Sequence, residues 1–201
     1  RFLGSLAKYN QLFSKQIKKN INIRNYHYSP LQELQEKFNP VLAPFGNYKL
    51  PMKFQGYVSK DVTINTRKPN HCTIFDVSQM AVIELSLRDF HARRILLNHE
   101  NNYLSDMLER IFPVNTNILT QNKSVLSVVL NERCEIQDDF IIGNIDNQKY
   151  RFIVNANTQD KFMLLMNQNM EVLNSKYFWF PRNYKVELKK CEKIILAIQG
   201  P

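Results

Sequence analysis

Residues 124–156 read SVLSVVLNERCEIQDDFIIGNIDNQKYRFIVNA, and this stretch establishes the fold class. Segments 124–130, 139–145 and 151–155 are rich in β-branched and aromatic residues, a composition that favours strands. A turn is expected around Asp146 and Asn147, where polar residues interrupt the apolar runs. Because short polar links join these segments, consecutive strands can pair as antiparallel neighbours. The stretch therefore predicts three successive strands of an antiparallel sheet.

Strand and helix patterns continue outward on both sides. Further strands are predicted at residues 73–78, 81–87, 184–188 and 193–198. Helices are predicted at residues 31–38, 90–98 and 104–111, and after Asn157, which can cap a helix N-terminus. The buried face of this last helix is expected to consist of Phe162, Leu165, Met166, Met170 and Leu173. This order predicts an α+β fold, an antiparallel sheet with helices packed on one face.

The segment between the first helix and the strand at 73–78 has a weaker pattern. Pro44, Gly46, Asn47 and Pro51 mark a loop, since these residues favour turns and interrupt regular structure. Residues 62–67 contain β-branched side chains and are expected to form a short strand or an irregular link.

Composition excludes several classes of protein. The chain has 201 residues, of which 44% are apolar, too many for a disordered chain. No apolar run approaches the ~20 residues that cross a bilayer, so stable membrane insertion is not expected. Three scattered cysteines do not make a disulfide scaffold or a zinc ribbon, and five glycines leave no glycine-rich phosphate loop.

Positive charge is concentrated at the N-terminus. The net charge is +9, and residues 1–32 hold six of the 27 basic and none of the 18 acidic side chains, leaving +3 for the rest. Apolar residues recur there at helical spacing, so residues 1–30 are expected to form a basic amphipathic segment, a mitochondrial presequence. The alternative is a basic helix on the surface or on anionic lipid. Charge gathered at one end argues against nucleic-acid binding, which needs a basic folded face.

Two adjacent acids, Asp138 and Asp139, open the strand predicted at 139–145. Since neighbouring strand residues point to opposite faces, Asp139 should share a face with Ile141 and Gly143, while Asp138 points the other way. Spacing alone favours two solvated acids over a paired catalytic dyad. No metal site is expected, because the H-E-x-x-H pattern starting at His99 has Tyr103 in place of its second histidine.

Several short motifs resemble one known family. HCTIFDVSQM at 71–80, NE and IQDDFI at 131–141, VNA at 154–156 and ILAIQGP at 195–201 occur in order, with LP at 50–51 upstream. Together they resemble the T-protein, or aminomethyltransferase, family of the glycine cleavage system. The resemblance covers about residues 31–201. It implies the N-terminal part of the family's folate-binding domain, truncated at its C-terminal side.

The resemblance implies an activity and a set of site residues. T-proteins take the aminomethyl group carried by the lipoylated H-protein, pass its one-carbon unit to tetrahydrofolate as co-substrate, and release ammonia. Asp139 matches the family's key acid. The folate would also contact Met80, Ile153 and Asn155. With the presequence, the expected location is the mitochondrial matrix.

The resemblance leaves three rivals and contains three departures. The main rival is a folate-binding protein of the same superfamily that supports iron–sulfur cluster assembly. The others are the folate domain of a dimethylglycine- or sarcosine-dehydrogenase fusion, which the early presequence argues against, and a basic binding module without catalysis, which the charge distribution disfavours. The family's paired glycines are replaced here by Cys134 and Glu135, Arg151 stands where relatives often have an aromatic residue, and Gln79 where many have histidine.

Overall fold

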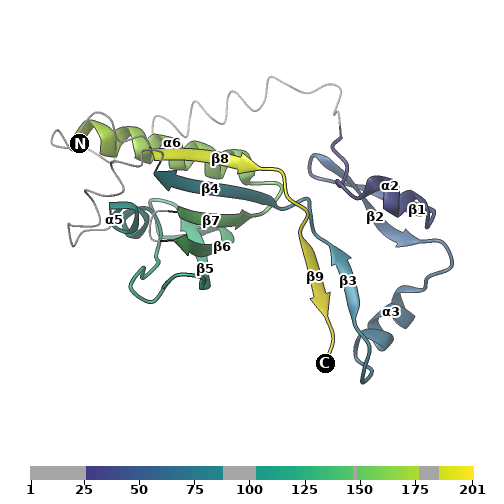
Figure 1. The fold of residues 1–201 in the computed structure, drawn as a ribbon. Coiled ribbons are helices and arrows are strands. Elements are labelled where there is room, and N and C mark those ends of the chain that lie inside the picture. Colours follow the sequence, from purple (N-terminus) through teal and green to yellow (C-terminus); the bar gives the residue numbers. More distant parts are fainter. Residues whose placement is uncertain (1–25, 88–102, 147–148, 177–185) are drawn as a thin grey trace.

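The computed structural model describes residues 26–87, 103–146, 149–176 and 186–201. Five antiparallel strands form the main sheet, in the order β5-β6-β7-β4-β8 (Figure 1). Their bounds are β4 Ala81–Leu87, β5 Ser124–Leu130, β6 Ile136–Asp146, β7 Lys149–Val154 and β8 Val186–Cys191. Strands β5, β6 and β7 are those expected from residues 124–156, and β6 begins three residues earlier than predicted. The α+β prediction with an antiparallel sheet is confirmed.

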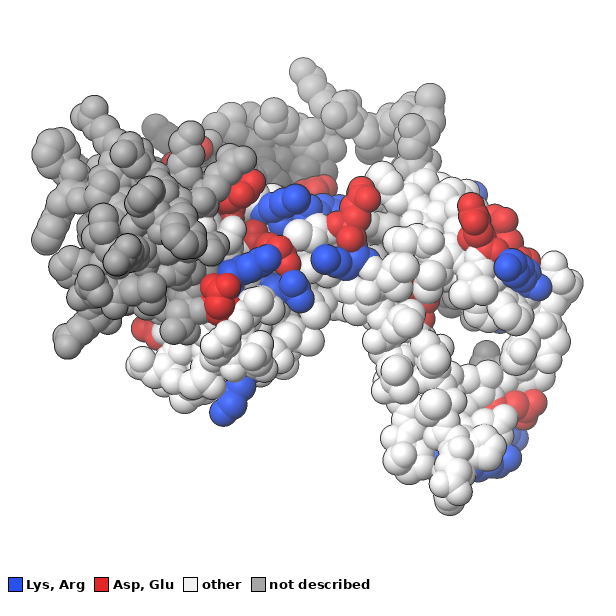
Figure 2. Space-filling model, viewed as in Figure 1, with Lys and Arg blue, Asp and Glu red and all other residues white. Residues whose placement is uncertain are grey.

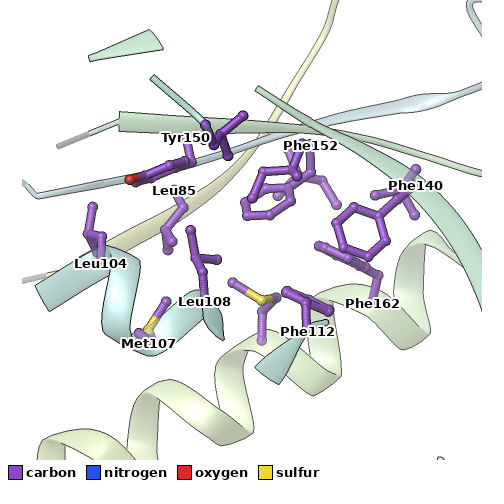
Figure 3. Packing of buried hydrophobic residues seen from close by; sticks show 14 of the residues in the cluster. Leu85, Leu104, Met107, Leu108, Phe112, Phe140, Tyr150, Phe152 and Phe162 are labelled. Atoms are coloured by element: carbon purple, nitrogen blue, oxygen red, sulfur yellow. The ribbon is translucent and has the colours of Figure 1, made fainter. Parts of the chain in front are cut away.

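Helices α5 (Tyr103–Ile111) and α6 (Gln159–Lys176) lie against one face of this sheet. Alternate strand residues point toward them, and Phe140, Phe152 and Phe162 meet Phe112 in an aromatic cluster (Figure 3). The Phe112 and Phe162 rings stack with centroids 5.5 Å apart. Burial of each aromatic side chain contributes about 2–3 kcal/mol to the free energy of folding, because its apolar surface leaves water. This cluster therefore holds the helices on the sheet.

Helix α6 begins at Gln159, so its N-cap lies one residue later than the predicted Asn157. The amide of Phe162 donates to the carbonyl oxygen of Thr158 at 2.9 Å, which places Thr158, not Asn157, at the N-cap position. Of the predicted buried face, Phe162 and Met166 are fully buried, and Leu165 and Met170 pack against the core. The Leu173 side chain lies outside the described residues, as does the helix predicted at 90–98.

The N-terminal part differs from expectation in two places. The predicted loop is a hairpin of β1 (Pro40–Phe45) and β2 (Tyr48–Phe54), and residues 62–67 are mostly in a helix, α3 (Ser59–Thr66). In this two-stranded ribbon the outer edges of both strands are unpaired apart from a bridge between Tyr48 and His27, so Pro44 and Pro51 fit without a missing ladder bond. In α3 the Thr66 hydroxyl donates to the Val62 carbonyl at 2.7 Å, a local bond that suits a helix.

A second ribbon joins β3 (Thr73–Asp76) to the far end of the described chain, β9 (Leu196–Gln199). Its Ile74 and Ile198 side chains are mostly exposed, and Figure 2 shows this ribbon as largely uncharged. A short helix, α2 (Gln32–Glu36), lies next to the β1–β2 hairpin (Figure 1), and its segment is bonded to this ribbon. Asp76 connects the two, because its Oδ2 accepts bonds from the Ser29 hydroxyl and from Gln35 Nε2 at 2.5 Å. Both donors are buried, so this carboxylate holds the N-terminal segment on the ribbon.

None of the helices in the described parts of the chain combines the length and the apolar character that crossing a membrane requires.

Candidate functional site

Strand register brings three of the predicted site residues together where β6, β7 and β4 end, and this end of the strands is called the site edge of the main sheet. Phe140 of β6 and Ala81 of β4 both pair with Val154, the last residue of β7. Asp139 precedes Phe140, Met80 precedes Ala81, and Asn155 follows Val154, so the three lie on neighbouring strands. With strands ~4.8 Å apart, Met80 and Asp139 lie roughly 10 Å from each other on either side of Asn155.

The two acids lie on opposite faces, as strand alternation predicts. Asp138 is half-buried on the face of Phe140 and Ile142, which point into the core. Asp139 is exposed on the other face with Ile141, which pairs with Ile153 on β7. Ile153 pairs in turn with Val82 on β4, so an apolar row borders Asp139. The fourth predicted residue, Ile153, therefore lies one row inward from the other three.

Asn155 contacts both carboxylates through one nitrogen. Its Nδ2 donates to Asp138 Oδ1 at 2.8 Å, to Asp139 Oδ1 at 3.1 Å and to the Asp139 carbonyl at 3.2 Å. The Thr158 hydroxyl donates to the other oxygen of Asp138. Sequence analysis did not single out Thr158, and the signal that could have identified it is its N-cap position four residues after the VNA motif begins.

Chemically, this edge offers an exposed carboxylate next to an apolar wall. Within the described residues no protein group donates a hydrogen bond to Asp139 Oδ2, so this oxygen can accept a proton or a hydrogen bond from a bound molecule. Ile153 and Ile141 supply a surface for a flat ring, and the flexible thioether of half-buried Met80 can pack beside it.

A second charged cluster occupies the same face of the sheet, further along the strands. Arg151 donates to Glu84 Oε1 through Nε at 3.0 Å and Nη2 at 2.6 Å, and Lys149 Nζ lies 2.9 Å from Oε2. Partial burial raises the pKa of Glu84, but hydrogen bonds from Lys149 and Arg151 and their charges outweigh it and lower the pKa to about 2. Figure 2 shows basic and acidic side chains interleaved over the middle of the molecule, where Figure 1 places β4 and β8.

Arg151, a departure from the family pattern, is therefore the ion-pair partner of Glu84. The second departure also fits the fold. Cys134 has φ 61, the left-handed conformation that glycine adopts readily, and Asn131 Oδ1 accepts the amides of Arg133 and Glu135, each at 2.9 Å. The turn thus keeps the backbone conformation that glycine favours, although a cysteine occupies the position.

Within the described residues, no three histidine, cysteine, aspartate or glutamate side chains lie together as metal ligands would.

Comparison with known proteins gives a consistent family likeness. No protein-family model matches the chain. The chain is similar in sequence to aminomethyltransferases: it is 28% identical over 173 residues to "Aminomethyltransferase, mitochondrial" from Mus musculus, covering 86% of this chain and 37% of the relative. It is 27% identical to the aminomethyltransferase of Staphylococcus carnosus, covering 86% of this chain and 40% of that protein.

Its fold is similar to that of a solved structure, the glycine cleavage system aminomethyltransferase T from Bartonella henselae. The TM-score is 0.66 at 25% sequence identity, over 88% of this chain and 41% of that one. Sequence and fold thus confirm the resemblance to the T-protein of the glycine cleavage system. The chain spans about two-fifths of the length of the curated relatives it matches.

Proposed function

We propose that this protein is a tetrahydrofolate-dependent aminomethyltransferase of the glycine cleavage system. It transfers the one-carbon unit from the aminomethyl-dihydrolipoyl H-protein to tetrahydrofolate, and ammonia leaves. The observation that supports this most is the meeting of Asp139, Asn155 and Met80 at one sheet edge, in a chain similar to aminomethyltransferases.

The proposed chemistry assigns Asp139 the proton-transfer role. One folate amine attacks the aminomethyl carbon and displaces the dihydrolipoyl sulfur as a thiolate. The second folate nitrogen then attacks the same carbon and displaces ammonia, so two carbon–nitrogen bonds form, the bonds to sulfur and to the amino group break, and each attacking nitrogen loses its proton. An exposed carboxylate on a rigid strand can accept that proton and stabilise the positive charge that develops on nitrogen. Asn155 contacts Asp139 directly, while Met80 and Ile153 would pack against the ring system.

We also propose mitochondrial location, with residues 1–30 as an import segment and residues 31–201 as the N-terminal part of the folate-binding domain. The basic, acid-free composition of residues 1–32 supports it, and so does the similarity to relatives described as mitochondrial from Mus musculus and Schizosaccharomyces pombe. Bacterial aminomethyltransferases match as well, so import of a tagged protein into isolated mitochondria is the measurement that tests it.

Replacement of the Asp139 carboxylate tests the activity. Asp139→Asn keeps the shape and one acceptor but removes the base, so ammonia release from aminomethylated H-protein with tetrahydrofolate should fall at least ~100-fold in the full-length protein. Asp106→Asn, which changes an exposed acid on α5, serves as the matched control and should stay within about twofold. Full activity of Asp139→Asn would refute the assignment of Asp139.

A further inference from the structure

The orientation of the Asn155 amide is determined by its neighbours. Three oxygens surround its Nδ2: Asp138 Oδ1, Asp139 Oδ1 and the Asp139 carbonyl. All three are acceptors, so a rotated amide would bring its own carbonyl oxygen against them and lose every bond. The amide therefore has a single favourable orientation, with Nδ2 toward the acids and Oδ1 away from them.

Asp138 is the inner anchor of this arrangement. It is half-buried and its two oxygens are both occupied, one by Asn155 and the other by the Thr158 hydroxyl. Thr158 is itself fixed, because its amide donates to the Asn155 carbonyl at 3.2 Å and its carbonyl accepts the first bond of α6. Helix α6, Thr158, Asp138 and Asn155 thus form a continuous chain of bonds that ends at the exposed carboxylate.

This chain of bonds decides what the site presents to a bound molecule. Both Asn155 amide protons are engaged by protein oxygens, so the side chain offers only its carbonyl oxygen outward. Asp139 likewise offers its second carboxylate oxygen. Two adjacent acceptors complement a ligand that presents N–H donors, and they repel a ligand that presents carboxylate or phosphate oxygens.

We propose that Asp138 and Thr158 are positioning residues that lock the Asn155 amide so that the site selects an edge of N–H donors on its ligand. Neither residue touches the ligand; both act through Asn155. The identity of the ligand, tetrahydrofolate, rests on the proposed function, whereas the locking of the amide does not.

Four variants of the full-length protein separate positioning from a merely structural contribution. Thr158→Val removes the hydroxyl at nearly constant volume, and Thr158→Ser restores it. Asp138→Ala removes both acceptors, and Asp138→Asn restores one acceptor for Asn155 and a donor toward Thr158. The matched control is Thr116→Val, because the Thr116 hydroxyl also donates to a carboxylate, that of the α5 residue Glu109, at 2.6 Å.

The first readout is the Asn155 side-chain amide in nuclear magnetic resonance spectra, with its hydrogen exchange. We expect exchange about tenfold or more faster in Thr158→Val and Asp138→Ala, an intermediate rate in Asp138→Asn, and wild-type rates in Thr158→Ser and Thr116→Val. The second is kcat/KM for tetrahydrofolate, expected to fall about tenfold in the first two variants and to stay within twofold in Thr158→Ser and Thr116→Val.

Two outcomes would overturn the inference. One is an Asn155 amide that exchanges equally in Thr158→Val, Asp138→Ala and the wild-type protein. The other is a Thr158→Val protein that loses as much thermal stability as Thr116→Val but no more activity, which would make the Thr158 bond structural only. A wild-type protein that does not convert tetrahydrofolate would refute the proposed function instead, and the amide exchange would still decide whether Asp138 and Thr158 lock Asn155.

Discussion

Glu84 is held between two cations on the face of the sheet that points away from the helices. Only 14% of its side chain is exposed, and its pKa of about 2 lies below the ordinary value of 4.5. A carboxyl whose pKa is lower in the folded than in the unfolded state stabilises the fold above pH ~4.5, and this stabilisation is lost as the pH falls toward about 2. Since Lys149 and Arg151 are about one-third exposed, solvent screening reduces the effect to about 1–2 kcal/mol.

We therefore expect Glu84→Gln to lower the free energy of unfolding by about 1–2 kcal/mol at pH ~7 and by about half as much or less at pH ~3. Urea denaturation of both proteins across this pH range measures the difference. Glu132→Gln, at an exposed acid in the β5–β6 turn, is the control and should change stability by less than about 0.5 kcal/mol at either pH. A Glu84→Gln deficit that does not shrink in acid would contradict the ion-pair explanation.

Strand alternation predicts the side-chain directions within β6, but not those of residues that follow the end of β7. Alternation correctly separates Asp139 from Asp138. It gives no hint that one amide contacts both acids, because Asn155 lies just past the end of β7, where the backbone turns into α6 and no longer follows the pleat. The roles of Asp139, Met80, Ile153 and Asn155 stay predictions until the variants are measured.

The β5–β6 turn shows how one element tolerates an unusual residue. Cys134 has φ 61, a conformation that costs a side-chain-bearing residue about 1–2 kcal/mol and costs glycine little. Cys134→Gly should therefore raise the free energy of unfolding by about 0.5–1 kcal/mol, after allowing for glycine's greater entropy in the unfolded chain. Chemical denaturation of the two proteins is the measurement.

The neighbouring position supplies the comparison for this prediction. Arg133 lies in the same turn but is not among the residues with positive φ, so Arg133→Gly should destabilise by about 0.5–1 kcal/mol. If both glycine variants shift stability in the same direction, strain at Cys134 is not the cause.

Elements with strong periodic patterns were predictable, and short ones were not. Strands β5 and β7 and helix α5 have local sequence and tertiary packing that agree, so their patterns sufficed. The β1–β2 hairpin and α3 lie outside the main core, where prolines and β-branched residues give conflicting local signals. Pro44 and Pro51 predict a loop, because the sequence does not reveal that each lies in a strand with a largely unpaired outer edge.

At the scale of the whole molecule, the β1–β2 hairpin touches the main domain beside the candidate site. Gly46, in the hairpin turn, has φ 57, and a Cβ there would lie 1.7 Å from Oδ1 of Asn157, between Asn155 and α6. Gly56 has φ 81, but a Cβ there would meet nothing within 4 Å. The two glycines share the backbone requirement and differ in the contact, so comparing them isolates the packing of the hairpin on the site.

Gly56→Ala should cost about 1 kcal/mol of unfolding free energy, the penalty for alanine at positive φ. Gly46→Ala should cost at least about 1 kcal/mol more, because the added methyl group displaces Asn157 and separates the turn from the start of α6. Removing the obstructing side chain in the double variant Gly46→Ala/Asn157→Ala should bring the loss back to the Gly56→Ala level. Urea denaturation of the four proteins, with Asn157→Ala alone to complete the cycle, measures the coupling between the two positions.

Equal losses for Gly46→Ala and Gly56→Ala would mean that the hairpin and the site edge are energetically independent. A coupling of about 1 kcal/mol would instead show that the hairpin turn packs on Asn157, the residue before the N-cap of α6.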